Sequence, residues 1–444
     1  MKTDIIKIFL TAIAYMTMTV CAWAQSGLEG TWHGELSVPG GSLMLVFHFD
    51  PVECTIDSPD QGAYGIPAEL KTLNASKAHV EVPSLGASFE GNLMFGLLVG
   101  KFKQSGLEFP MSLKRGDIER KRPQTPAGPY PYASEEVTFS NPEDGAVLSG
   151  TLTYPADYGC ETPVVLLVSG SGLQNRDEEI YSHKPFLVIA DHLARNGIAS
   201  LRYDDRSFGK STGNAVGATT ETFKKDALAG LEFLRSLGKF SKIGLAGHSE
   251  GGTIAFLLAG EGKTDFIISL AGTATDGATV LVEQNRKILK GNGIPESAVD
   301  DYCEVLAKLY ADPDMTAEEL GKLAAGLAPD MKQNIMSVRE TKDPWVQHFI
   351  SFDPGEAIRK IACPVMALNG ENDVQVIADS NIPVLKELLK DNGKNKIKIY
   401  PDLNHLFQHS ETGMPDEYGK IEETMSTEVL DDMTNWIKAL KDLQ

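Results

Sequence analysis

Cysteine is scarce in this chain, with five among 444 residues. After the first, Cys21, the others are Cys54, Cys160, Cys303 and Cys363, which lie far apart and lack the CxxC spacing of zinc and dithiol redox sites. The sequence therefore excludes a cysteine-based metal site. Scattered cysteines in a chain long enough to build a large core are typical of small buried side chains, and their pairing stays open.

Positive charge is also in short supply. Lys and Arg number 41 against 61 Asp and Glu, which gives a formal net charge of −20. Contacts from Lys and Arg to phosphate dominate the affinity of proteins for nucleic acids, so we expect no nucleic-acid partner. Hydrophobic residues make up 42% of the chain and charged residues 23%, a balance that predicts a folded, soluble protein.

Long apolar runs are missing too. The amino-terminal apolar stretch from Ile8 to Val20 is shorter than the roughly 20 residues that cross a bilayer, so we expect no stable membrane insertion. Lys2 and Lys7 lie at its start, and Ala22-Trp23-Ala24 follows it with the small-x-small pattern of a cleavage site. The pattern predicts a signal peptide over residues 1–24 and a secreted or periplasmic protein.

The remaining chain divides at a proline-rich stretch. Residues 25–118 carry short segments of alternating polarity between Gly, Pro and Asp, which predicts a small all-β module, a sandwich or a barrel. Residues 119–134 include the run PQTPAGPYP, whose prolines remove backbone donors and fix φ. We interpret this stretch as a linker, and its position as the domain boundary.

Residues 135–444 alternate apolar runs with amphipathic segments, which predicts an α/β unit with a mostly parallel sheet. After two opening strands, the expected buried strands are Val164–Val168, Ala199–Tyr203, Ile243–Ala246, Phe266–Leu270, Val365–Leu368 and Ile397–Tyr400. Residues 273–360 show helical periodicity with no convincing strand. We expect a helical cap there, over the carboxyl edge of the sheet.

The sharpest motif is Gly247-His248-Ser249-Glu250-Gly251, which follows an expected strand and opens an expected helix. A serine on so tight a turn projects its hydroxyl outward, and the flanking glycines allow close backbone approach. The pattern predicts a nucleophile elbow in an α/β fold. We predict Ser249 as the nucleophile.

Serine is a weak nucleophile unless a base removes its proton and an acid orients that base. In this fold both follow the nucleophile along the chain, the acid after a late strand and the histidine after the last strand. Asp373 is the predicted acid, with Glu371 as its competitor, and His405 is the predicted base, with His409 a weaker choice.

A tetrahedral oxyanion needs backbone donors. The residue after the nucleophile supplies one, here Glu250, and the Gly-rich turn after Val164–Val168 supplies the other. We predict the Ser171 amide, with Gly172 and Leu173 as alternatives. The same turn lacks the Lys-Ser/Thr ending of a phosphate loop, and the chemistry requires no cofactor.

The blocks GSGLQNRDE, RYDDRSFGKSTG, GHSEGG, PWVQHFISFDP and CPVMALNGENDVQV resemble those of bacterial EstD-type α/β-hydrolases, over roughly residues 135–444. Members are serine esterases, often described as serine-aminopeptidase-like, and the resemblance assigns the same roles to Ser249, Asp373 and His405. Ser207 departs from the family, whose members usually have glycine after the Asp-Arg pair.

The resemblance implies a carboxylesterase that acts on a small or polymer-borne ester through an acyl-enzyme. A serine exopeptidase would share every catalytic residue and would need a pocket for a free amino terminus, for which acidic residues of the cap or Glu178 and Glu179 are candidates. A non-enzymatic binding protein with a vestigial hydrolase fold is the alternative of another class. Trp345, Phe349 and Phe352 form either an apolar wall for the substrate or the core of the cap. The sequence does not determine the oligomeric state.

Overall fold

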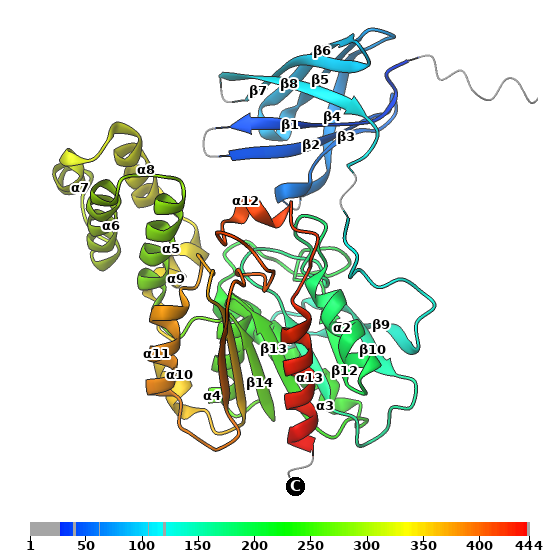
Figure 1. The fold of residues 1–444 in the computed structure, drawn as a ribbon, viewed down its shortest axis with the longest axis vertical. Helices are drawn as coiled ribbons and strands as arrows, with labels where there is room; N and C mark the ends of the chain where they lie inside the picture. Colours follow the sequence, from blue (N-terminus) through cyan, green and yellow to red (C-terminus); the bar gives the residue numbers. More distant parts are fainter. Residues whose placement is uncertain (1–26, 39–40, 62, 105, 119–120, 442–444) are drawn as a thin grey trace, which may run out of the picture. The chain divides into compact units, whose positions relative to one another are not determined.

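The structure, a computed structural model, describes residues 27–38, 41–61, 63–104, 106–118 and 121–441. The expected signal peptide and Cys21 lie outside these residues. The chain divides into two compact units, Met1–Glu119 and Arg120–Gln444 (Figure 1).

The first unit is a closed antiparallel barrel in which each strand pairs with the next and β1 pairs with β8. Its strands are β1 (Gly30–Val38), β2 (Gly41–Phe49), β3 (Cys54–Ser58), β4 (Ala63–Leu73), β5 (Lys77–Val82), β6 (Ala87–Met94), β7 (Leu97–Gln104) and β8 (Leu107–Arg115). The alternation of apolar residues points every second side chain inward, where Trp32, Phe47 and Phe89 are buried in one cluster. The expected all-β module is confirmed, and it is a barrel with an interior filled by side chains.

The second unit is built on a sheet of order β16-β15-β14-β13-β11-β12-β10-β9. Its strands are β9 (Tyr132–Ser140), β10 (Val147–Pro155), β11 (Val164–Val168), β12 (Ala199–Tyr203), β13 (Ile243–His248), β14 (Phe266–Leu270), β15 (Val365–Gly370) and β16 (Lys396–Tyr400). The strands from β11 to β16 run parallel, and β9 and β10 form an antiparallel hairpin at one edge. The α/β-hydrolase architecture is confirmed.

Helices cover both faces of this sheet (Figure 1). They are α2 (Pro185–Arg195), α3 (Thr220–Ser236), α4 (Glu250–Gly260), α10 (Gly355–Lys360), α11 (Ala378–Leu388) and α13 (Thr427–Lys441). One core cluster joins one sheet face to α3, α4, α10 and α11, and the other joins the opposite face to α2 and α13. Since the strands are apolar on both faces, the carboxyl ends of β11, β13, β15 and β16 are held rigidly at one edge.

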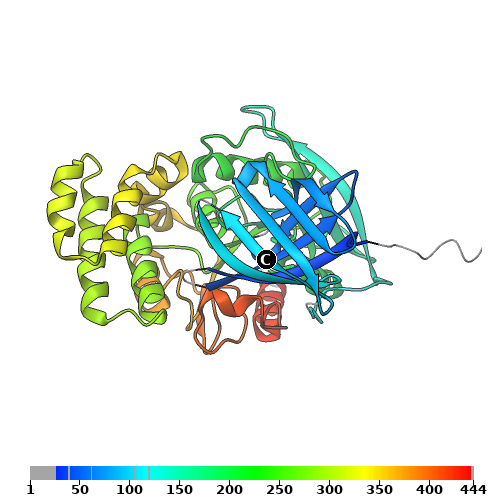
Figure 2. The ribbon, with the colours of Figure 1, turned by 90° about the horizontal axis from the view of Figure 1, so that it is seen from above.

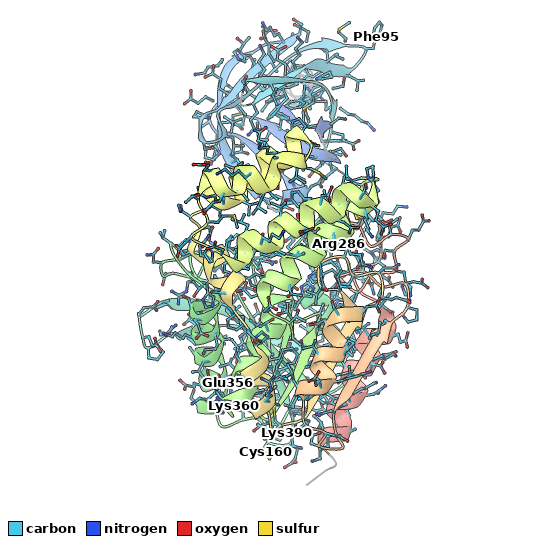
Figure 3. The ribbon with its side chains drawn as sticks, turned by 90° about the vertical axis from the view of Figure 1, so that its left-hand side faces the viewer. Phe95, Cys160, Arg286, Glu356, Lys360 and Lys390 are labelled. Atoms are coloured by element: carbon cyan, nitrogen blue, oxygen red, sulfur yellow. The ribbon has the colours of Figure 1, made fainter. Side chains whose placement is uncertain are left out.

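The insertion between β14 and β15 is helical, as expected. Its helices are α5 (Gly277–Gly291), α6 (Glu296–Ala311), α7 (Ala317–Leu323), α8 (Pro329–Glu340) and α9 (Pro344–Ser351), followed by α10. Figure 2 shows α5 to α8 gathered into a bundle, and their apolar residues form a core cluster of their own. Arg286 of α5, labelled in Figure 3, pairs with Asp300 of α6 and ties the bundle together.

The expected limit of the cap, residue 360, is too late. Helix α10 buries Ile358 in the core cluster that α3, α4 and α11 form on one face of the sheet. Gly260 of α4 packs against the backbone of Ala357. The cap proper therefore ends with α9. Helical periodicity shows that α10 has an apolar side, but it does not say which surface that side contacts.

The expected linker of residues 119–134 also differs from the structure. Strand β9 begins at Tyr132, inside that range, and pairs with β10. Arg122 donates to the carbonyl oxygens of Gly419 and Ile421, each at 3.0 Å. Gln124 accepts from Thr424 N and donates to Met425 O at 2.7 Å. This stretch is therefore bound to the second unit instead of running free.

Cys54, Cys160, Cys303 and Cys363 are all free thiols. Burial raises the pKa of Cys54 to about 11 and that of Cys363 to about 11, which keeps both thiols protonated and unreactive at neutral pH. No helix in the described ranges has the length and apolar character that a membrane span requires.

Candidate active site

Ser249 lies on the turn between β13 and α4, in a strained conformation with φ 54° and ψ −117°. Glycine is required on both sides of the turn. A Cβ on Gly247 would come within 1.9 Å of Gly251 O, and one on Gly251 within 2.1 Å of Val168 O. The backbone thus passes too closely for any side chain at these two positions, which explains their spacing around the serine.

His405 and Asp373 are hydrogen-bonded. Asp373 lies on the loop after β15, and its Oδ2 is 2.8 Å from His405 Nδ1 on the loop after β16. Both side chains are buried. A buried carboxylate that accepts from Nδ1 fixes the ring orientation and leaves Nε2 as the nitrogen able to take a proton.

The surroundings of the two candidate acids differ. Asp373 Oδ1 accepts the backbone amides of Gln375 and Val376 at 2.8 and 2.9 Å, and Asn369 donates to its other oxygen. Glu371 is exposed to solvent. The structure therefore holds Asp373 against the histidine, whereas the Glu371 side chain is exposed to solvent. His409 is likewise exposed and pairs with Glu423.

Ser249 and His405 line one pocket, which has a volume of about 160 Å³. Its other lining residues are Gly170, Ser171, Gln174, Glu178, Ile180, His248, Gln375, Leu406 and Tyr418. In the described part of the chain, no hydrogen bond joins Ser249 Oγ to His405 Nε2. Catalytic contacts of this kind are often loose until substrate binds.

The two predicted oxyanion donors lie at this site. Ser171 lines the pocket, and Glu250 directly follows Ser249 as the first residue of α4. Within the described residues, neither backbone amide donates to a protein acceptor. Two free amides beside the nucleophile suit the binding of a developing oxyanion.

Asp205 anchors the Gly-rich loop that carries Ser171. It accepts the Gln174 amide at 2.8 Å and the Ser169 hydroxyl at 3.2 Å. Burial, with a smaller contribution from Asp226, raises the pKa of Asp205 to about 8 although its hydrogen bonds act the other way. The Asp205 carboxyl therefore keeps its proton to a much higher pH than an ordinary aspartate. The sequence pattern places Asp205 in the pair before Ser207 but does not indicate this contact with the Gly-rich loop.

Glu250 has a second role through its side chain. Its Oε1 accepts the Thr220 hydroxyl at 2.6 Å and Trp345 Nε1 of α9 at 2.8 Å. Trp345 stacks on Phe349 with ring centroids 5.0 Å apart. Neither these aromatic residues nor Phe352 line the pocket beside Ser249. Trp345 joins the cap to the nucleophile helix through its hydrogen bond to Glu250. Of the two alternatives from the sequence, an apolar wall would have to lie outside this pocket.

Ser207 adopts φ 61°, in the left-handed region. Its hydroxyl donates to Gly213 O at 2.7 Å. This conformation disfavours side chains and explains why glycine is usual at the position. The loop closes around Arg206, which is buried and paired with Asp226 at 2.7 Å, so the substitution is absorbed locally.

A second histidine and carboxylate lie in the same pocket. Glu178 Oε1 is 2.9 Å from His248 Nδ1, and both side chains are buried.

Gln375 donates to the Tyr418 hydroxyl at 3.1 Å across the pocket. In the sequence, the one indication of the contact between Gln375 and Tyr418 is that Gln375 lies two residues after the predicted acid. Within the described residues, no cluster of His, Cys, Asp or Glu could hold a metal ion.

The chain resembles known hydrolases. The family described as Serine aminopeptidase, S33 matches residues 182–412, just over half of the chain. Esterase EstD of Thermotoga maritima is 29% identical over 316 residues, which cover 70% of this chain and 68% of that protein.

Solved structures of other hydrolases align with part of the chain. The Pyrococcus furiosus esterase Pf2001 aligns with a TM-score of 0.44 and 16% identity, covering 73% of this chain and 99% of its own. Proline iminopeptidase of Mycobacterium smegmatis aligns with a TM-score of 0.42 and 14% identity, covering 69% and 99%.

The sheet order and the serine turn between β13 and α4 define an α/β-hydrolase. Within that class, the chain belongs to the Serine aminopeptidase, S33 family.

Proposed function

We propose that this protein is an exported serine esterase that hydrolyses carboxylic esters through an acyl-enzyme on Ser249, with His405 as base and Asp373 as the acid that orients it. The observation that carries the proposal is that Ser249 and His405 line one pocket, while Asp373 holds His405 Nδ1 at 2.8 Å. The similarity to Esterase EstD supports the same reaction.

The reaction proceeds in two steps. Ser249 Oγ attacks the ester carbonyl while His405 Nε2 takes its proton, and the oxyanion is stabilised by the Ser171 and Glu250 amides. His405 then gives the proton to the departing alcohol, which leaves Ser249 acylated. Water, deprotonated by His405, attacks the acyl group and releases the carboxylic acid, and the proton returns to Ser249.

The exopeptidase alternative needs a carboxylate free to bind an ammonium group. Glu178 is the carboxylate among the described lining residues, and it is already bound to His248 and to the Gly170 amide. Glu179 accepts from Asn175 at 3.2 Å and lies 3.6 Å from Lys184. Glu178 and Glu179 are therefore both engaged by other partners, which supports an ester substrate over one with a free amino group at these two residues.

The test compares p-nitrophenyl esters with aminoacyl-p-nitroanilides, using the wild-type protein and Ser249→Ala. The proposal expects turnover of the esters, little or none of the anilides, and loss of both in the variant. Faster cleavage of the anilides would make the protein a peptidase. Export is tested separately by sequencing the amino terminus of the protein recovered outside the cytoplasm, which should begin at Gln25.

A further inference from the structure

Glu178 and His248 form a second acid–histidine pair, next to the one formed by Asp373 and His405. His248 is 7% exposed and Glu178 3% exposed, and the His248 ring lies 4.7 Å from the His405 ring, centroid to centroid. The proposed reaction assigns no chemical step to this pair. Buried ionisable groups beside a nucleophile call for an explanation, because burial of charge is costly.

The contacts of the pair join three separate segments. Glu178 Oε1 accepts the Gly170 amide at 2.8 Å as well as His248 Nδ1 at 2.9 Å. His248 Nε2 lies 2.9 Å from the backbone oxygen of His405. The pair thus connects the Gly-rich loop after β11, the end of β13 and the loop after β16.

These contacts imply that His248 is charged. A carbonyl oxygen can only accept, so Nε2 must donate to His405 O, and Nδ1 donates to the Glu178 carboxylate. Burial alone would lower the pKa of His248, but the charge and hydrogen bond of Glu178, with smaller contributions from the His405 carbonyl and Asp373, raise it above the ordinary value. The two hydrogen bonds therefore favour an imidazolium held by a carboxylate.

Each contact ends on a catalytic residue or on its neighbour in the chain. Gly170 precedes Ser171, the predicted oxyanion donor, and His248 precedes Ser249. The third contact is to the backbone of His405 itself. A displacement of about 1 Å at such positions can cost about a hundredfold in rate.

Resting on the function proposed above, we propose that Glu178 and His248 are positioning residues that hold the oxyanion loop, the nucleophile and the general base in register. Glu178 fixes the Gly170 amide, and His248 fixes the His405 loop through its carbonyl. Without the pair, the substrate still binds, but the three groups no longer meet in the geometry of the transition state.

The experiment measures kcat and KM for p-nitrophenyl acetate, with the melting temperature, for Glu178→Gln, Glu178→Asp and His248→Gln. Glu179→Gln is the matched control, because it removes the adjacent carboxylate, which does not contact His248. We expect Glu178→Gln to lower kcat by about 10- to 100-fold with KM within about threefold of wild type. Glu178→Asp should recover part of the loss, and Glu179→Gln should match wild type.

Affinity for a trifluoromethyl ketone, which forms an oxyanion on the serine, should fall in parallel with kcat in Glu178→Gln. If that variant is unfolded at the assay temperature, His248→Gln gives the same comparison, because its amide can still donate to His405 O but carries no charge.

Two results would overturn the inference. One is a lower melting temperature with wild-type kcat per folded molecule in both Glu178→Gln and His248→Gln, which would make the pair structural only. The other is an equal loss in Glu178→Gln and Glu179→Gln. Failure of the proposed function looks different, since the wild-type protein itself would then hydrolyse no ester.

Discussion

His405 Nδ1 lies 2.8 Å from Asp373 Oδ2, although 32 positions separate the two residues in the chain. The loops after β15 and β16 bring them together because parallel neighbouring strands end at the same edge of the sheet. The serine lies on the turn after β13, two strands from β15 and three from β16 in the same sheet. The proposed chemistry depends on this arrangement.

Loss of the nucleophile or of the base should abolish turnover. We expect Ser249→Ala and His405→Ala each to lower kcat with p-nitrophenyl acetate by more than about a thousandfold, because the members of such a unit act together. Circular dichroism should show an unchanged fold. More than about a tenth of the wild-type kcat in either variant would mean that the assignment is wrong.

The two acids should rank in one order. Asp373→Asn presents an amide where the imidazole needs an acceptor, so kcat should fall by about a thousandfold or more. Glu371→Gln changes an exposed side chain and should stay within about twofold of wild type. Steady-state kinetics of both variants measure this ranking. A larger loss of kcat in Glu371→Gln than in Asp373→Asn would make Glu371 the acid that orients His405.

Asp205 should make stability depend on pH. Its folded-state pKa of about 8 lies above the ordinary value of 3.8, so the stability it contributes is complete below about pH 4 and is lost as the pH rises to about 8. Asp205→Asn mimics the protonated form and can still bond to Ser169 and to the Gln174 amide.

Thermal unfolding of both proteins between about pH 5 and about pH 8 checks this. The melting temperature of Asp205→Asn relative to wild type should rise across that range, with a limiting slope of about 1.4 kcal/mol per pH unit in the free energy of unfolding. A pH-independent difference would show that Asp205 does not titrate there.

The stretch before β9 should matter for stability. A fragment that begins at Arg120 keeps the hydrogen bonds of Arg122 and Gln124, whereas one that begins at Tyr132 loses them. At about 1 kcal/mol per hydrogen bond, the shorter fragment should melt at least about 5 °C lower. Both should hydrolyse small soluble esters when folded. Equal melting temperatures would show that this stretch contributes nothing.

The pocket should limit the acyl group. A volume of about 160 Å³ is close to that of cavities known to hold one benzene molecule, roughly 150 Å³. We expect kcat/KM for p-nitrophenyl esters to be highest for acetyl or propionyl and to fall at least about tenfold by decanoyl. A maximum at long chains would require an acyl site outside the pocket.

Much of the fold could be predicted from the sequence. Strands such as Val164–Val168 and Phe266–Leu270 were found with their bounds because a short apolar run between helical segments has few other interpretations. Ser249 was predicted from two glycines whose spacing reflects backbone contact. Asp373 and His405 followed from the chain order of the fold.

Other features depend on contacts between distant parts of the chain. Arg122 contacts backbone oxygens nearly three hundred positions away, so its proline-rich surroundings looked like a free linker. The sequence shows that α10 has an apolar side, but it does not show whether that side packs against the sheet or against the cap. The Glu178 and His248 pair depends on the loop after β11 folding back over β13, which no local pattern records.

The most direct test of the account is the site of covalent labelling by a fluorophosphonate, which reacts with activated serines. Peptide mapping of the inactivated wild-type protein should place a single adduct on the peptide that contains Ser249, and Ser249→Ala should take up none. An adduct on another serine, or ester hydrolysis that continues after Ser249 is fully labelled, would contradict the account.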